Sequence, residues 1–68
     1  MNISEKIELI NNKIQFWENE LEYSRQAVSY LYSLGNEIKI EMNDKYIKDI
    51  ELKLSVLKNE ALTLTNQG

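Results

Sequence analysis

Acidic side chains are the most abundant groups in this chain that could do chemistry. Eight of the eleven form two runs: Glu18, Glu20 and Glu22, then Glu37, Glu41, Asp44, Asp49 and Glu51. In some helical bundles, carboxylates hold two metal ions together with Glu-x-x-His pairs. This chain has no His and no Cys, and none of these carboxylates takes an inward position on the helices predicted below. We therefore expect solvated surface charge, with no metal site and no cofactor.

Sequence patterns of catalysis are missing as well. Without His or Cys, no Ser-His or Cys-His pair can form, and the chain has neither a glycine-rich phosphate loop nor a zinc-binding spacing. We therefore expect no catalytic residues and a protein that is not an enzyme.

The basic residues do not form a separate face for nucleic acid. Lys39, Lys45, Lys48, Lys53 and Lys58 all fall in the second half, where acidic residues are interleaved with them. A surface that follows a phosphate backbone would segregate its basic residues and place aromatic side chains between them. The net charge of −3 weakly opposes such binding. Nucleic-acid binding is therefore only a third hypothesis.

Size and composition limit how this chain can fold. With 68 residues, it is near the lower limit for a self-sufficient core, and domains this small commonly need a disulfide, a metal or a second chain. A second chain is the support left to it. The lack of Pro, with only two Gly, suits long helices.

The composition also bears on where the protein acts. No apolar run approaches the length of a membrane span, and the first residues lack the basic-then-apolar pattern of a secretion signal. The abundance of Lys, Ile and Asn is typical of AT-rich bacterial and phage genomes. We expect a cytoplasmic protein of a bacterium or a phage-infected cell, without a membrane partner.

Apolar residues recur every three or four positions on both sides of Gly35. Ahead of it run Ile7, Ile10, Ile14, Trp17, Leu21, Ser24, Val28 and Leu31; behind it, read backwards, run Leu64, Ala61, Leu57, Leu54, Ile50, Ile47, Asn43 and Ile40. If the chain folds back at Gly35, these positions face one another in eight layers, as in an antiparallel coiled coil. We call them the seam. Trp17 is then a core residue, and the polar members Ser24 and Asn43 are interpreted as fixing the register.

Local signals place the ends of the helices. Asn2 can cap the first helix, Gly35 can take the left-handed conformation that ends helices, and Asn36 can cap the second. The sequence therefore predicts an all-α fold, an antiparallel two-helix hairpin in a single domain. The predicted bounds are 1–68 for the domain, about 3–34 for the first helix, 35–36 for the turn and about 37–66 for the second helix.

The connection admits an alternative. Residues 37–42 alternate charged and apolar side chains, which is typical of a strand. Residues 36–43 would then form a loop or an edge strand, with Asn43 and Asp44 capping a shorter second helix. We favour the continuous hairpin because Ile40 keeps the seam spacing and no second candidate strand exists.

A second apolar stripe lies outside the seam. Its members are Leu9, Phe16, Tyr23, Ala27, Tyr30 and Leu34 on the first helix, with Ile38, Met42, Leu52 and Val56 as a thinner counterpart on the second. A surface helix of a simple hairpin should be polar there, and contiguous exposed apolar area commonly marks an interface. The stripe is interpreted either as the core of a homodimeric four-helix bundle or as a docking face for a different protein.

These features predict a non-enzymatic protein-protein interaction module. We expect a self-associating hairpin, with a dimer favoured, that binds another protein of unknown identity through the aromatic stripe. The alternative is a small phage-type inhibitor or adaptor that acts as a monomer on a host protein, including a nucleic-acid-binding one. The sequence does not identify the partner.

Overall fold

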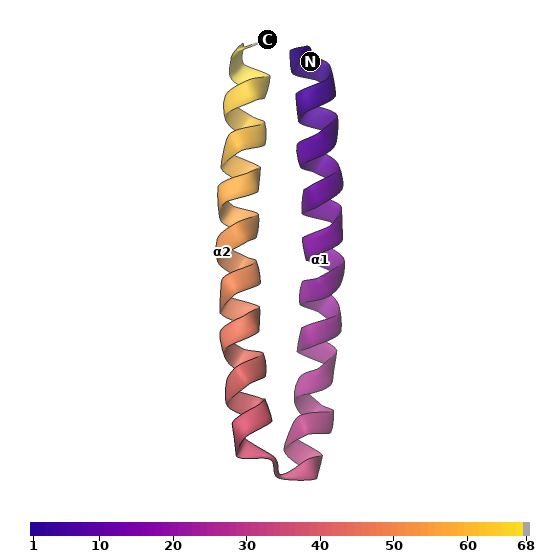
Figure 1. The fold of residues 1–68 in the computed structure, drawn as a ribbon, viewed down its shortest axis with the longest axis vertical. Coiled ribbons are helices and arrows are strands. Elements are labelled where there is room, and N and C mark those ends of the chain that lie inside the picture. Colours follow the sequence, from indigo (N-terminus) through magenta and orange to yellow (C-terminus); the bar gives the residue numbers. More distant parts are fainter. Residues whose placement is uncertain (68) are drawn as a thin grey trace.

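The computed structural model describes residues 1–67 as two antiparallel α-helices joined by a tight turn (Figure 1). Helix α1 spans Ile3–Leu34 and helix α2 spans Glu37–Gln67. The all-α hairpin predicted from the mirrored seam is thereby confirmed. Residues 37–42 lie within α2, so the strand alternative for this segment is wrong. Gly68, the last residue of the predicted domain, lies outside the described residues.

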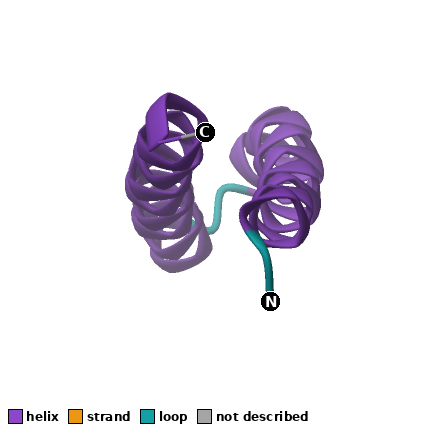
Figure 2. Ribbon diagram, turned by 90° about the horizontal axis from the view of Figure 1, so that it is seen from above, coloured by secondary structure: helices purple, strands orange, loops and turns teal. Residues whose placement is uncertain are grey.

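The two helices form a thin rod. Its extents are 50 × 15 × 14 Å, and its first and last turns lie side by side at the end opposite the connection (Figure 1). Seen down the rod, the helices form a single layer, so each has one helical neighbour (Figure 2). Most of the circumference of each helix is therefore open to solvent.

Three of the predicted helix ends, those marked by Asn2, Gly35 and Asn36, are confirmed by their hydrogen bonds. The Asn2 side-chain oxygen accepts from the backbone N–H of Glu5 at 2.8 Å, and the Asn36 side-chain oxygen accepts from that of Lys39 at 3.1 Å. Gly35 has φ 68°, in the left-handed region, and its N–H donates to the Tyr32 carbonyl at 3.1 Å. These bonds satisfy backbone groups that a helix end leaves without partners.

The core of the hairpin is the seam. Every seam position is buried or half-buried, and outside it only Glu20, Ala27 and Asn36 reach that level among the described residues. Ile50 is completely buried, and Leu54 and Ser24 are nearly so. A core this narrow shields few side chains fully, because no third element covers it.

A polar contact joins two residues of the seam itself. The side-chain amide of Asn43 donates to the backbone carbonyl oxygen of Ser24 at 3.0 Å. In a helix, a carbonyl points toward the residue four positions further on, which here is Val28, and Val28 is the residue that faces Asn43 in the predicted layers. A shift of either helix by one turn would break this bond, so the contact supports a role for Asn43 in fixing the register.

Candidate protein-interaction face

Contacts between the helices mark two different long faces, one on each side of the seam. On one side, the Tyr46 hydroxyl donates to Glu20 at 3.1 Å, and the Lys53 ammonium lies 4.3 Å from the centre of the Trp17 ring. On the other side, two exposed ion pairs join the helices, Arg25–Glu51 at 3.8 Å and Lys58–Glu18 at 3.9 Å. In an antiparallel pair, positions flanking the seam on one side of a helix meet their equivalents on the same side of the partner helix. The two faces can therefore be assigned along the whole rod.

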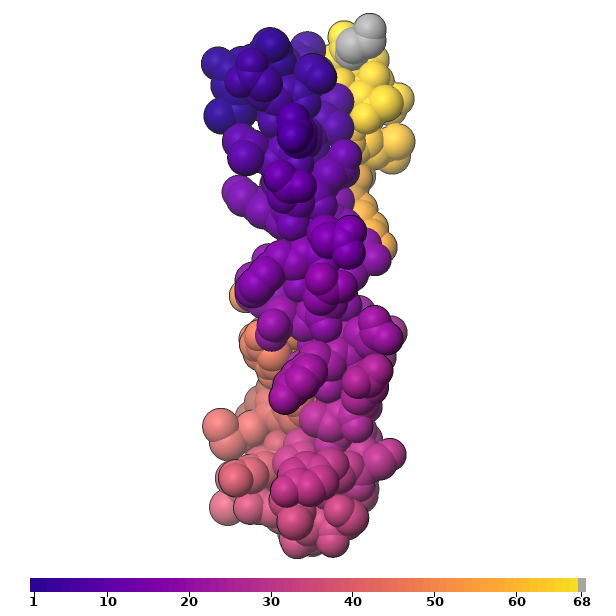
Figure 3. Space-filling view, turned by 90° about the vertical axis from the view of Figure 1, so that its right-hand side faces the viewer, coloured from indigo at the N-terminus to yellow at the C-terminus, as the bar shows by residue number. Residues whose placement is uncertain are grey.

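The first of these surfaces, which we call the aromatic face, gathers most of the apolar side chains outside the seam. Its apolar members are Leu9, Phe16, Tyr23, Ala27, Tyr30 and Leu34 of α1 with Met42, Tyr46 and Val56 of α2. Phe16, Tyr23 and Tyr30 are 55%, 74% and 65% exposed. From the side of α1, the molecule is a thin rod from which individual side chains stand out (Figure 3).

Two hollows with mainly apolar walls open on the aromatic face. We name them after one member each: the Trp17 hollow is lined by Lys13, Trp17, Leu52, Lys53, Val56 and Leu57, and the Met42 hollow by Leu31, Lys39, Met42, Asn43, Lys45, Tyr46 and Asp49. Each is walled mostly by α2, with one or two residues from α1. Both hollows also include charged residues in their lining, Lys13 and Lys53 in the first and Lys39, Lys45 and Asp49 in the second. An apolar side chain that entered either hollow would therefore have charged neighbours.

Trp17 combines two roles. It holds its place in the seam, where it is half-buried, and one edge of its side chain also lines a hollow. Its ring meets Phe16 edge-to-face, with ring centroids 5.0 Å apart and planes at 81°. Such pairs are favourable beyond the area they bury. Phe16 therefore packs against Trp17 while more than half of its surface stays exposed.

The pKa of one tyrosine on the aromatic face, Tyr46, is raised. Desolvation by partial burial, the hydrogen bond to Glu20 and the negative charge of that carboxylate all raise the pKa of Tyr46 above its ordinary value of 10. The neutral hydroxyl is thus the form the fold prefers. At neutral pH this hydroxyl ties α2 to α1 across the aromatic face.

The opposite surface, which we call the acidic face, is polar along most of its length. It carries Glu8, Glu18, Glu22, Glu37, Glu41, Asp44 and Glu51 against three basic residues, Arg25, Lys48 and Lys58. The aromatic face instead carries Lys6, Lys13, Lys39 and Lys53 against Glu20, Asp49 and Glu60. Negative charge is therefore concentrated on the side that lacks the aromatic stripe.

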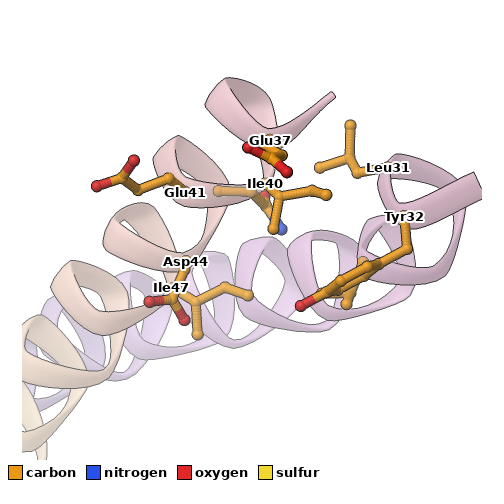
Figure 4. A pocket seen from close by; sticks show the side chains of 9 residues that line it. Leu31, Tyr32, Glu37, Ile40, Glu41, Asp44 and Ile47 are labelled. Carbon is orange, nitrogen blue, oxygen red and sulfur yellow. The ribbon is translucent and has the colours of Figure 1, made fainter. Parts of the chain in front are cut away.

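A groove near the turn lies on the acidic face (Figure 4). Tyr32 of α1 and Glu41 and Asp44 of α2 line its sides. Ile40 and Ile47 are among the apolar residues that form its floor. Within residues 1–67, no group of acidic side chains is arranged to hold a metal ion. The groove thus offers a tyrosine ring among carboxylates, with no ligand set for a cation.

The predicted interface residues do not all share one surface. Those of α1 lie on the aromatic face together with Met42 and Val56, and all of them except the half-buried Ala27 are exposed. Leu52 borders this face at the Trp17 hollow, whereas Ile38 lies on the side of α2 turned away from the seam. The stripe is therefore continuous on α1 and thinner on α2.

Sequence reasoning missed Tyr46 and Lys53 as members of this face. Tyr46 immediately precedes the seam residue Ile47, just as Ala27 precedes Val28. This shared position could have assigned Tyr46 to the aromatic face. In an antiparallel pair of helices, residues directly before the first seam residue of each heptad lie on the same face of both helices and contact one another.

Neither described helix is long and apolar enough to cross a membrane. Searches against protein-family models, curated proteins and solved structures find no significant match to this chain. Function is therefore inferred from the surface of the hairpin itself.

Proposed function

We propose that this protein is a non-enzymatic protein-protein interaction module that acts through its aromatic face. The observation that carries this proposal is the uneven distribution of exposed side chains, with most of the exposed aromatic residues on one side of the seam and most of the carboxylates on the other. A hairpin that acted as an inert spacer would have no need to keep one of its two faces apolar. Contiguous exposed apolar area of this kind is characteristic of interaction sites.

Helix-on-helix docking is the mode of recognition we propose. Tyrosine suits such a surface because its ring supplies a large contact area while its hydroxyl can still form hydrogen bonds. Burial of the face contributes about 25 cal/mol for each Å² of apolar area removed from water. Docking of one hairpin on another through this face gives a dimeric four-helix bundle. We propose that this dimer acts in the cytoplasm of a bacterium or phage-infected cell.

The experiment compares two tyrosines of nearly equal exposure on opposite faces. Tyr30 is 65% exposed on the aromatic face, and Tyr32 is 64% exposed on the acidic face of the same helix. We expect Tyr30→Glu, alone or with Tyr23→Glu, to lower the mass measured by light scattering, because a buried unpaired carboxylate is costly. Tyr32→Glu should leave the mass unchanged.

The outcomes separate the proposal from its competitor. If Tyr30→Glu and Tyr32→Glu have the same mass as the unmodified protein at every concentration, the aromatic face is not the interface. If the unmodified protein is itself a monomer whose melting temperature does not change on dilution, self-association is wrong. The monomeric inhibitor or adaptor is then the better description.

A further inference from the structure

We infer that the occupant of the aromatic face is a second copy of this chain whose turn lies at the same end of the rod. In this arrangement α1 of each copy packs against α2 of the other. The inference rests on the self-association in the proposed function and adds to it the direction in which the second copy lies.

Two-fold symmetry leaves two ways to stack aromatic face on aromatic face. If the symmetry axis runs along the rod, both turns lie at one end and each α1 covers the partner's α2. If the axis crosses the rod, the turns lie at opposite ends, so α1 covers α1 and α2 covers α2. The hollows and the charges of the face distinguish these two arrangements.

The hollows favour the same-end arrangement. Phe16 precedes Trp17 in the chain and Tyr30 precedes Leu31, so each aromatic residue stands at the height of one hollow. An axis along the rod preserves height and moves α1 over the partner's α2, which supplies most of the wall of each hollow. Phe16 of the second copy therefore meets the Trp17 hollow, and Tyr30 of the second copy meets the Met42 hollow.

The opposite-end arrangement places poorer groups over the hollows. It sets α2 against α2, and Tyr46 is the only aromatic residue that α2 contributes to this face. The Tyr46 hydroxyl is already bonded to Glu20 of its own chain. The aromatic residues of α1 would then face one another, and the hollows on the α2 side would stay without an aromatic occupant.

The charges of the face favour the same arrangement. Glu20 of α1 and Lys53 of α2 lie at similar heights, near the middle of the rod. With the turns at the same end, Glu20 of one copy meets Lys53 of the other, and Lys13 meets Glu60 in the same way. With the turns at opposite ends and the rods overlapping fully, Glu20 meets Glu20 and Lys53 meets Lys53. Like charges set against each other disfavour that alternative.

The area of the face is large enough for a specific dimer. A surface as long and wide as the rod, 50 Å by 15 Å, amounts to roughly 750 Å² for each copy, close to the ~800 Å² per partner of a standard interface. A second hairpin of the same length covers it from end to end.

Distances between spin labels test the direction of the second copy. The chain has no Cys of its own, so the single substitutions Glu5→Cys, Asn19→Cys and Ser33→Cys each introduce one labelling site. These exposed residues lie on the side of α1 turned away from the seam, near the first turns, the middle and the Gly35 turn. Circular dichroism checks that each labelled protein keeps its helices.

Double electron-electron resonance should give nearly the same distance, on the order of 30 Å, for all three labels, since helices pack about 8–10 Å apart and label tethers add to this. In the opposite-end dimer, the two copies of the Glu5→Cys label would lie at opposite ends of the rod, and so would the two copies of the Ser33→Cys label. At 1.5 Å per residue along a helix, each of these two distances would be on the order of 40 Å or more. Only Asn19→Cys would stay short. That pattern overturns the inferred direction and leaves the proposed function standing.

Absence of dipolar coupling from all three labels has a different meaning. It would show that two copies do not associate, which overturns both the inference and self-association in the proposed function. Distances on the order of 30 Å from both Glu5→Cys and Ser33→Cys support the same-end dimer and exclude the opposite-end one.

Discussion

Replacing Ile50 with Val tests whether the seam carries the stability of the hairpin. Ile50 is completely buried, so the substitution removes one CH₂ group from the tightest part of the core. Transfer of that group to water costs about 0.8 kcal/mol, and the space it leaves brings the usual Ile→Val loss to about 0.5–1.5 kcal/mol. We expect a loss of about 1 kcal/mol in the free energy of unfolding.

Ile38→Val is the matched control. Ile38 lies in the same helix and undergoes the same chemical change, yet it is 73% exposed. Its substitution should change the free energy of unfolding by less than about 0.5 kcal/mol.

Urea unfolding followed by far-ultraviolet circular dichroism gives both values. All samples need the same protein concentration, because association of folded chains adds stability that depends on concentration. The dependence of stability on urea should be unchanged, so that the midpoint alone reports the difference. Equal losses at Ile50 and Ile38 would refute the seam as the core of this fold.

Three further outcomes are expected from local features. Gly35→Ala should lower the free energy of unfolding by about 1 kcal/mol in thermal or urea unfolding, because φ 68° is strained for a side chain, although nothing lies within 4 Å of the added carbon; no loss would contradict the left-handed turn. Asn36→Ala should cost about 1 kcal/mol by the same measurement through loss of the cap to Lys39, and Asn36→Asp should retain most of the stability. The raised pKa of Tyr46 means that its neutral form stabilises the fold, so that contribution is present below pH 10 and lost as the pH rises through the folded-state pKa. Ultraviolet titration of the unmodified protein should show a tyrosine ionisation above pH 10 that Tyr46→Phe removes; its persistence in the variant would exclude Tyr46 as the source.

The hairpin could be predicted because its signal is repeated along the whole chain. The spacing of three and four residues recurs on both sides of Gly35, and a repeat near 3.5 keeps one stripe facing a partner helix. The strand pattern of residues 37–42 was weaker because it is local. Ile40 within it makes a seam contact, and the Asn36 cap starts a helix there.

The composition of the aromatic face was harder to predict than the seam. A stripe on one helix can be read from its own spacing, as for Phe16, Tyr23 and Tyr30. Which side chains of the other helix share that face depends on how two helices are set together across the seam. Tyr46 and Lys53 belong to it through contacts with Glu20 and Trp17, and their positions directly before Ile47 and Leu54 indicate this only once the pairing of the two helices is known.

The mirrored arrangement of the layers about Gly35 also orders the steps by which the chain can fold. The layer of Leu31 and Ile40 joins residues close in the chain, whereas the layer of Ile7 and Leu64 joins its two ends. Because the entropy lost on closing a loop grows with its length, contacts next to the turn form at the lowest cost. Folding should therefore proceed like a zipper from Gly35. Weakening the layers beside the turn would slow folding, and weakening those at the far end would chiefly speed unfolding.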